Sequence, residues 1–535
     1  MKTKFYLLRF LTIITLLYPS IRELKAQDSL YLVGTITGES NEKKIVEVKG
    51  VGDVNADGYG DFMISMRTGK TKSDQGIVKL YLGSASADLT PDVIFHNPGK
   101  DSLNDFRVAS GVGDVNGDGY DDFTISGSFN DWGYAKGKVF LYFGGETVDT
   151  IPVGEFYGYG IQDVFGGVTG IGDIDKDGYD DFTIGSPYNW TDGRGYVYLF
   201  WGGDSVSWGG STTFVSDTLE DFLGESVANI GDVNKDGYDD IAIGATAWTS
   251  GHDTGKVYVY YGGIQMDTKE DTVLIADSLE YSFGDKIKNA GDINKDGVID
   301  FFIGSKGANI YLYLGIDSLT IINGALLGYG GYMNIETGFD INNDGYNDFI
   351  IGNTNYLNDD SLWVGGAFCY LGNDKLNNTY HFKSEGEARG SEFSKIMSTA
   401  DINNDGYDEL LILAPSFPDF DNPFGKLYIY SYKKITDVVN HENALPDNFK
   451  LYQNYPNPFN PNTIISWESP VFSHITIKIF DILGKEAVTL LNEERPAGRY
   501  EIEFDTSKYK PSSGIYFCEL KTNNFISIKK MILLR

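Results

Sequence analysis

Seven copies of one short acidic loop constrain the fold of this chain more than any other feature. The first copy reads Gly-Asp-Val-Asn-Ala-Asp-Gly-Tyr-Gly-Asp over residues 52–61. The copies begin at Asp53, Asp114, Asp173, Asp232, Asp292, Asp340 and Asp401, so successive starts lie 61, 59, 59, 60, 48 and 61 residues apart. Repetition of a unit of that length predicts seven similar supersecondary units that pack side by side.

The residue types in the loop are those of a calcium site. Counted from the first Asp, positions 1, 3 and 5 carry Asp, Asn or Asp, and Asp; position 6 is always Gly, and position 9 is always acidic. Alternate positions of a tightly wound loop can present oxygens to one point, and the Gly permits the sharp turn. The backbone carbonyl of position 7 can add another oxygen. Calcium takes about six to eight hard oxygen ligands, and the loop has no soft ligand that would favour zinc or copper.

The sequence therefore predicts up to seven structural calcium ions, each held by positions 1, 3, 5, 7 and 9 of one loop. The predicted ligands in the first four loops are Asp53, Asn55, Asp57, Tyr59 and Asp61; Asp114, Asn116, Asp118, Tyr120 and Asp122; Asp173, Asp175, Asp177, Tyr179 and Asp181; and Asp232, Asn234, Asp236, Tyr238 and Asp240. Those in the last three are Asp292, Asn294, Asp296, Val298 and Asp300; Asp340, Asn342, Asp344, Tyr346 and Asp348; and Asp401, Asn403, Asp405, Tyr407 and Glu409.

Two known classes of calcium loop, the EF-hand and the dockerin, do not fit this pattern. An EF-hand needs a bidentate Glu at position 12, where the second copy has Ile125, and it needs helical flanks, which are absent here. A dockerin is excluded because its loops lie closer together, on helices. A single loop of this kind can also be a surface turn without an ion, but seven copies in register disfavour that interpretation for the set.

The segments around each loop predict β-strands. Short β-branched and aromatic runs bounded by Gly, such as residues 138–143 and 272–275, are typical of strands. Four strands in about 60 residues correspond to one propeller blade, so we expect an all-β, seven-bladed β-propeller over residues 27–437. The seventh repeat lacks a fourth strand after residues 426–430. We expect residues 29–34 to close the ring as the outer strand of that last blade.

These repeats resemble the FG-GAP family, whose units build the propeller of the integrin α-subunit. The Phe-Gly pair that gives the family its name recurs at Phe165-Gly166 and Phe283-Gly284, whereas Phe106-Arg107 departs from the pattern. The resemblance covers about residues 40–434. It implies that a ligand binds the face opposite the calcium loops.

The last ninety residues differ in composition from the repeats. A linker is expected at 438–449, and residues 450–535 predict short strands in a small Ig-like β-sandwich. The run Tyr-Pro-Asn-Pro-Phe-Asn-Pro at 455–461, together with residues 481–485 and 513–516, resembles the type A C-terminal sorting domain of type IX secretion. This resemblance implies contact with that secretion machinery and a secreted or outer-surface location. An ordinary Ig-like binding module is the alternative.

Charge and the N-terminus agree with export. Residues 1–26 combine a basic start with an apolar stretch and a small residue at Ala26, which predicts a signal peptide. No later segment is long and apolar enough to predict a transmembrane helix. The chain carries a net charge of −33, which disfavours binding to nucleic acid. Cys369 and Cys518 are too few for a disulfide framework and are expected to be buried.

The sequence favours a binding protein, active in adhesion or recognition of a protein or glycan, over an enzyme. The chain has five His, and none recurs at one position of the repeat. A calcium-dependent polysaccharide lyase or glycosidase is the alternative. The predicted loops between second and third strands carry aromatic side chains suited to sugar rings or protein hot spots, unless they pack between blades. These residues are Trp132, Tyr134, Tyr188, Trp190, Trp248, Tyr356, Trp363 and Phe417.

Overall fold

The computed structural model describes residues 29–534 with internal gaps, and the described part is built from β-strands. The gaps are 41–42, 69–75, 99–104, 129–136, 159–164, 188–193, 205–211, 217–220, 247–254, 277–281, 306–308, 316–317, 324–332, 359, 374–379, 420–422, 434–448, 472, 496–497, 507–511 and 523–524. The chain forms two compact units, divided between residues 435 and 436. The predicted signal peptide (1–26) lies outside the described residues, as does nearly all of the predicted linker (438–449).

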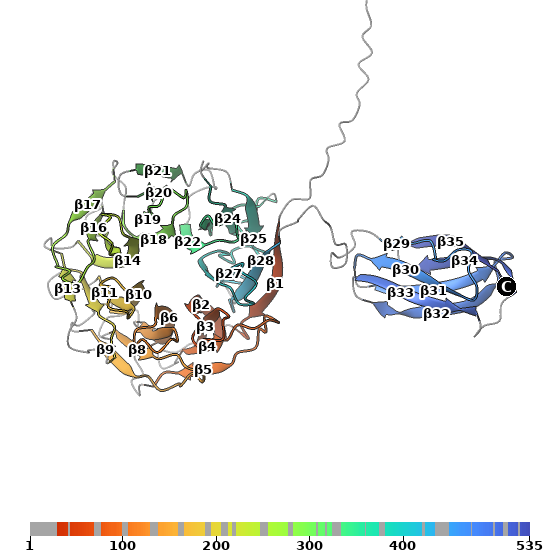
Figure 1. Cartoon of the computed structure of the whole chain (residues 1–535), viewed down its shortest axis with the longest axis horizontal. Helices are drawn as coiled ribbons and strands as arrows, with labels where there is room; N and C mark the ends of the chain where they lie inside the picture. The colour runs from red at the N-terminus through yellow and green to blue at the C-terminus, as the bar shows by residue number, and fades with distance from the viewer. Residues whose placement is uncertain are drawn as a thin grey trace, which may run out of the picture. The chain divides into compact units, whose positions relative to one another are not determined.

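The first unit is a seven-bladed β-propeller, which confirms the predicted fold class. Its seven four-stranded antiparallel sheets stand around a common centre (Figure 1). From the centre outward, the first three blades are β2 (Lys43–Gly52), β3 (Asp61–Thr68), β4 (Ile77–Tyr81) and β5 (Val93–His96); β6 (Asp105–Gly113), β7 (Asp122–Ser128), β8 (Lys138–Tyr142) and β9 (Gly154–Tyr157); and β10 (Gly167–Gly172), β11 (Asp181–Ser186), β12 (Tyr196–Phe200) and β13 (Thr212–Val215).

The remaining four blades repeat this order. Blades four to six are β14 (Leu223–Gly231), β15 (Asp240–Ala245), β16 (Lys256–Tyr260) and β17 (Thr272–Ile275); β18 (Lys286–Gly291), β19 (Asp300–Gly304), β20 (Asn309–Leu314) and β21 (Ser318–Asn323); and β22 (Met333–Phe339), β23 (Asp348–Asn353), β24 (Gly366–Tyr370) and β25 (Phe382–Glu385). Blade seven is β26 (Ile396–Ala400), β27 (Glu409–Ala414), β28 (Lys426–Lys433) and β1 (Ser29–Thr37).

The blades pack face to face, so their middle strands are buried on both sides. Every residue of β15, for example, is buried. A strand buried on both faces reads as a continuous apolar run rather than an alternating one. Within five blades an aromatic ring that follows position 9 stacks on the ring opposite it in the third strand, and the Phe62 and Tyr81 centroids are 4.8 Å apart. Such pairs add about 0.5–1.5 kcal/mol each beyond burial of their area.

Blade seven joins the two ends of the propeller. Its outer strand β1 comes from the N-terminal side of the unit and pairs antiparallel with β28, from Ser29 opposite Lys433 to Thr37 opposite Lys426. Leu30, Val33 and Ile36 of β1 pack against the cores on either side of this blade. The ring is therefore closed by hydrogen bonds between segments about 400 residues apart in the chain.

The second unit is a β-sandwich of two antiparallel sheets. One sheet has the order β29 (Lys450–Leu451), β30 (Asn462–Ser469), β33 (Gly498–Asp505), and the other the order β32 (Glu486–Arg495), β31 (Ser473–Asp481), β34 (Gly514–Lys521), β35 (Ile526–Leu533). Trp467, Ile477, Phe504 and Leu520 share its core. The proline-rich run at 455–461 lies against β35, where the Phe459 N–H donates to the Ile532 carbonyl at 2.9 Å.

Removal of β1 tests the ring closure. We expect a chain that starts after residue 37 to unfold at a lower temperature than one that starts at residue 27. The shorter chain loses the burial of three apolar side chains, each of which contributes about 1 kcal/mol or more to stability. It also loses the hydrogen bonds between β1 and β28. Calorimetric melting of both chains measures the difference. Equal melting temperatures would contradict closure by β1.

Candidate metal centres

The acidic loops all lie on one face of the propeller, because each connects the innermost strand of a blade to its second strand. Two positions in every loop have positive φ. Position 4 has φ between 50° and 74° and holds Ala, Lys, Asn or Gly, whereas position 6 has φ between 83° and 98° and holds only Gly. The first range is the left-handed helical region that L-residues can adopt, and the second lies beyond it. The backbone therefore explains why only position 6 is always Gly.

Backbone amides of each loop donate hydrogen bonds to the side chains at positions 1, 3 and 5, and positions 1 and 3 share the amide of position 5. In every loop, the carboxylate at position 1 accepts the N–H groups of positions 5 and 6; in the fourth loop Asp232 accepts from Asp236 at 3.0 Å and from Gly237 at 2.8 Å. The side-chain oxygen at position 3 accepts the N–H of position 5, and the carboxylate at position 5 accepts the N–H of position 7. Each loop thus holds its own oxygens close together.

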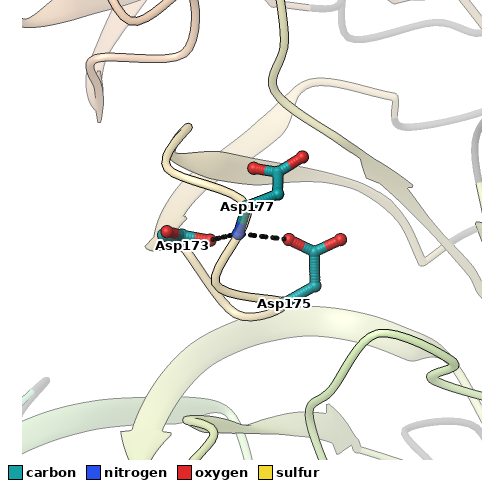
Figure 2. A group of neighbouring side chains, drawn as sticks. All are labelled: Asp173, Asp175 and Asp177. Carbon is teal, nitrogen blue, oxygen red and sulfur yellow. Dashed lines mark hydrogen bonds between the residues drawn. The ribbon is translucent and has the colours of Figure 1, made fainter.

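The third loop has the greatest density of carboxylates. Carboxylate oxygens of Asp173, Asp175 and Asp177 all lie within 4.8 Å of one another. Figure 2 shows the Asp177 amide nitrogen between the carboxylates of Asp173 and Asp175. Asp175 occupies position 3, where the other loops have Asn. Burial and the neighbouring Asp177 raise the pKa of Asp175, so a cation here would relieve the repulsion.

The amide at position 3 takes part in a different contact in the other loops. In the first loop Asn55 donates from its side-chain nitrogen to the carboxylate of Asp57 at 2.9 Å, and the second, fourth and sixth loops repeat this bond. In the seventh loop Asn403 donates instead to Glu409 at 2.9 Å, because the longer Glu side chain reaches it. The third and seventh loops therefore differ from these four.

The carboxylate at position 9 is buried in every loop. In the first six blades it accepts the N–H of position 2 and an N–H just beyond the third strand; Asp61 accepts from Val54 and from Gly83, each at 2.8 Å. In the third loop Asp181 is not among the three clustered acids. Position 9 thus ties the loop to its own blade.

Burial raises the pKa of every position 9 carboxyl above its usual range, although the backbone N–H donors oppose the shift. The pKa is raised to about 7 for Asp61, Asp122, Asp181, Asp300 and Glu409, to about 6 for Asp240 and to about 8 for Asp348. Desolvation disfavours the charged form of a carboxyl, which explains the direction.

In blades two and three the Asp at position 8 links the loop to the preceding blade, a role that the sequence did not suggest. The carboxylate of Asp121 in blade two accepts the N–H of Asp53 in blade one at 2.8 Å, and Asp180 accepts the N–H of Asp114 at 2.9 Å. Backbone bonds add to this joint, since the Gly145 N–H donates to the Val54 carbonyl at 2.8 Å. Polar residues at position 8 of most loops were the available signal, but only the ring shows which loops are neighbours.

The donor set of these loops fits calcium. Positions 1, 3 and 5 supply only oxygen atoms, and no His or Cys stands at any of the predicted ligand positions. The position 9 carboxylate and the carbonyl of position 7 remain predicted ligands. Bound calcium would supply positive charge to a group of carboxylates that otherwise repel one another.

Three of the eight predicted ligand-face aromatics lie in the described part of the chain. Trp363 is 40% exposed, in the connection between β23 and β24. Tyr356 is half-buried, with its ring against Phe368, and Phe417 is half-buried against Phe424. Two of the three thus contribute to packing. The other five, Trp132, Tyr134, Tyr188, Trp190 and Trp248, lie outside the described residues.

Family models match both units. Residues 223–260 and 396–430 match the FG-GAP repeat, and residues 453–534 match the secretion system C-terminal sorting domain. The chain therefore contains FG-GAP repeats followed by a sorting domain, as the sequence motifs predicted. The sorting domain supports export to the cell surface or secretion. No helix of the described residues has the length and apolarity needed to cross a membrane.

Several integrin α-subunits are similar to this chain. Human integrin alpha-6 is 28% identical over 265 residues, which are 49% of this chain and 22% of that protein. Integrin alpha-5 of Xenopus laevis is 33% identical over 148 residues, 26% of this chain and 14% of that protein. The chain thus spans less than a quarter of the length of these relatives.

One solved structure, of PorZ, described as a surface component of the type-IX secretion system of Porphyromonas gingivalis, aligns with 89% of this chain and 58% of its own. The alignment has a TM-score of 0.36 and a sequence identity of 11%, which are too low to support a conclusion about this chain.

The raised pKa values predict how stability depends on pH when calcium is chelated. The position 9 carboxyls keep their protons in the folded state up to pKa values of about 6 to 8. In the unfolded chain the same groups lose their protons above about pH 4. Because the folded state binds more protons in this range, its stability falls as the pH rises from about 4 to 8. We expect the melting temperature in chelator to decrease between about pH 5.5 and pH 8.

Two variants and added calcium serve as controls for this pH dependence of the melting temperature. Asp348→Asn resembles the protonated acid and should reduce the slope of melting temperature against pH, whereas the exposed Asp267→Asn should leave it unchanged. Excess calcium should also flatten the slope, because a bound cation favours ionised carboxylates. A melting temperature that rises with pH in chelator would disprove this assignment.

Proposed function

We propose that this chain is an exported, calcium-binding propeller that recognises a protein or glycan outside the cell. The observation that carries the proposal is an oxygen-rich loop repeated in all seven blades, in a chain that also contains a C-terminal sorting domain. Calcium is structural in this proposal: it holds the joints, and the opposite face is presented to the ligand. The type IX secretion machinery is the partner of the sorting domain.

The geometry of the loops supports calcium in particular. Backbone amides of the loop already hold the side-chain oxygens of positions 1, 3 and 5, and positions 1 and 3 share one donor, so little rearrangement is needed for binding. Calcium tolerates irregular coordination, whereas magnesium demands near-octahedral geometry. The third loop, with three clustered carboxylates, is the site proposed to bind most tightly, because affinity rises with ligand charge.

The face opposite the loops supports recognition. Connections between second and third strands emerge there, since each acidic loop is at the other end of the second strand. The exposed ring of Trp363 offers a flat surface of the kind that stacks on sugars and anchors protein interfaces. Integrin α-subunits, which this chain resembles in its repeats, are the source of the adhesion hypothesis.

Three histidines lie in the described residues: His96 is exposed at the end of the outer strand β5, and the other two have hydrogen-bond partners. His381 accepts the Leu371 N–H at 3.1 Å through Nδ1, and burial lowers its pKa. His474 is hydrogen-bonded to Asn492 in the sorting domain at 2.9 Å. The rings of His381 and His474 thus have structural partners, and the acid pairs are explained by the loops. The lyase or glycosidase alternative has no comparable observation in its favour.

Calcium removal tests the structural role of the metal. One site at a hundredfold excess of ion over its dissociation constant contributes about 2.7 kcal/mol, so chelation should lower the melting temperature clearly. The double variant Asp173→Asn, Asp177→Asn should reduce the calcium stoichiometry by one in equilibrium dialysis. Asp267→Asn, on the surface, is the matched control. An unchanged melting temperature in chelator would refute structural calcium.

Binding by the opposite face is tested with variants of its aromatic side chains. On a glycan array and against extracellular proteins, Trp363→Ala should weaken binding about tenfold or more, because a central aromatic contact contributes about 2 kcal/mol. Trp132→Ala, Trp190→Ala and Trp248→Ala test the side chains that the sequence predicts on the same face. Ile264→Ala, an exposed apolar side chain beyond the third strand of blade four, is the control on the calcium-loop face.

Two results would count against this proposal. Equal binding by all aromatic variants would reject the aromatic face as the ligand site. Conversion of a polysaccharide to unsaturated or shortened products by the calcium-loaded protein would instead support the enzyme alternative.

A further inference from the structure

The residue at position 4 of an acidic loop is not a predicted ligand, yet in several blades its side chain reaches the next loop of the ring. A Cβ added at Gly406 of the seventh loop would lie 3.2 Å from the side-chain nitrogen of Asn343 in the sixth loop. A Cβ added at Gly58 of the first loop would lie 3.2 Å from that of Asn404 in the seventh. Position 4 therefore approaches the tight turn of the neighbouring loop.

Lys295, at position 4 of the fifth loop, brings a positive charge to the sixth loop. Its Nζ donates a hydrogen bond to the Asp344 carbonyl at 3.1 Å and lies 3.7 Å from the centroid of the Tyr346 ring. A Cβ added at Gly345 would lie 2.8 Å from the same nitrogen. Asp344 and Tyr346 occupy positions 5 and 7 of the sixth loop, and both are predicted ligands. An ammonium group is thus held beside a site predicted to accept a divalent cation.

The other loops receive different groups from their preceding neighbours. Lys176 of the third loop lies farther from the fourth, with its Nζ 5.6 Å from the centroid of the Tyr238 ring. The second loop faces Ala56 and the third faces Gly117, neither of which carries a charged side chain. The sites therefore differ in the charge that the preceding loop places beside them.

The second and sixth loops form a matched pair. Both carry Asp, Asn, Asp, Tyr and Asp at positions 1, 3, 5, 7 and 9. In each, the position 8 carboxylate of the following loop, Asp180 or Asp408, accepts the N–H of position 1. They differ in the residue at position 4 of the preceding loop, which is Ala56 for the second loop and Lys295 for the sixth. These two residues have φ of 53° and 57°, so the backbone tolerates their exchange.

We propose that Lys295 lowers the calcium affinity of the sixth loop, which therefore fills after the second loop as calcium rises. This inference rests on the calcium role proposed above and adds an order of occupancy to it. The ammonium group repels the divalent ion, and at this exposed position the repulsion corresponds to about three- to tenfold in affinity. The joint between blades five and six thereby responds to calcium in a higher concentration range.

Direct contacts hold the same joint between the innermost strands of the two blades. Lys288 of β18 forms an ion pair with Glu336 of β22, with 3.0 Å between Nζ and Oε2. Lys286 of β18 donates a hydrogen bond from Nζ to the side-chain oxygen of Asn334 at 2.8 Å. None of these four residues belongs to an acidic loop. Blades five and six are therefore joined by contacts that need no calcium in the sixth loop.

Carbodiimide labelling of carboxylates during a calcium titration of the full chain tests the proposal, with mass spectrometry to read each loop separately. Asp118 and Asp344 are exposed at position 5 of the second and sixth loops, and a bound ion should protect both. In the wild type, half protection of Asp344 should need about three- to tenfold more calcium than half protection of Asp118. The difference should decrease at high salt, because screening weakens the effect of an exposed charge.

Exchange of the position 4 residues separates the charge from the ligands. Lys295→Ala should bring the calcium requirement of Asp344 close to that of Asp118, whereas Lys295→Arg, which keeps the charge, should leave it high. Ala56→Lys should raise the requirement of Asp118. Lys269→Ala, at an exposed position in blade four, is the matched control and should change neither.

The outcomes distinguish this inference from the calcium proposal on which it rests. Equal calcium requirements of the two loops in the wild type, or an Asp344 requirement that Lys295→Ala does not change, would overturn the inference and leave structural calcium standing. Protection of neither carboxylate at any calcium concentration would refute calcium binding by these loops, and the order of occupancy with it.

Discussion

The buried carboxylate at position 9 of each acidic loop is the contact on which the propeller depends. In the first six blades it accepts an N–H from the start of its loop and another from beyond the third strand, which fixes the loop to its blade. The loop then reaches the neighbouring blade through position 8 and backbone bonds. A buried carboxylate is stable only when its acceptors are satisfied, so the loop and the blade order each other.

In the proposed function, calcium stabilises the acidic loops by neutralising their carboxylates. Backbone amides of the loop hold the side-chain oxygens of positions 1, 3 and 5, and a calcium ion would remove the repulsion between their carboxylates. Because the loops also join blades, occupancy of a loop would be felt by the neighbouring blade. In the proposed function, ligand recognition on the opposite face would therefore depend on calcium without any contact between ion and ligand.

Much of the fold was predictable because the repeat carries it. The spacing of the Asp loops gave seven blades, and β17 and β28 fall at or around the strands expected at 272–275 and 426–430. The missing fourth strand after β28 pointed to the N-terminal segment, and β1 occupies that position. The aromatic ligand face stays a prediction, and within it Tyr356 and Phe417 are half-buried against neighbouring rings. Sequence spacing does not distinguish a ring that packs from one that faces solvent.

The sequence alone determined the number of blades, the oxygen-rich loops and the export domain, since each is encoded in contiguous residues. The tertiary structure alone decided which groups meet across the ring. Lys295 of the fifth loop lies against Tyr346 of the sixth, and Asp121 contacts Asp53 of the preceding blade. Local sequence patterns cannot predict such contacts, because they depend on how the seven blades are arranged around the propeller axis.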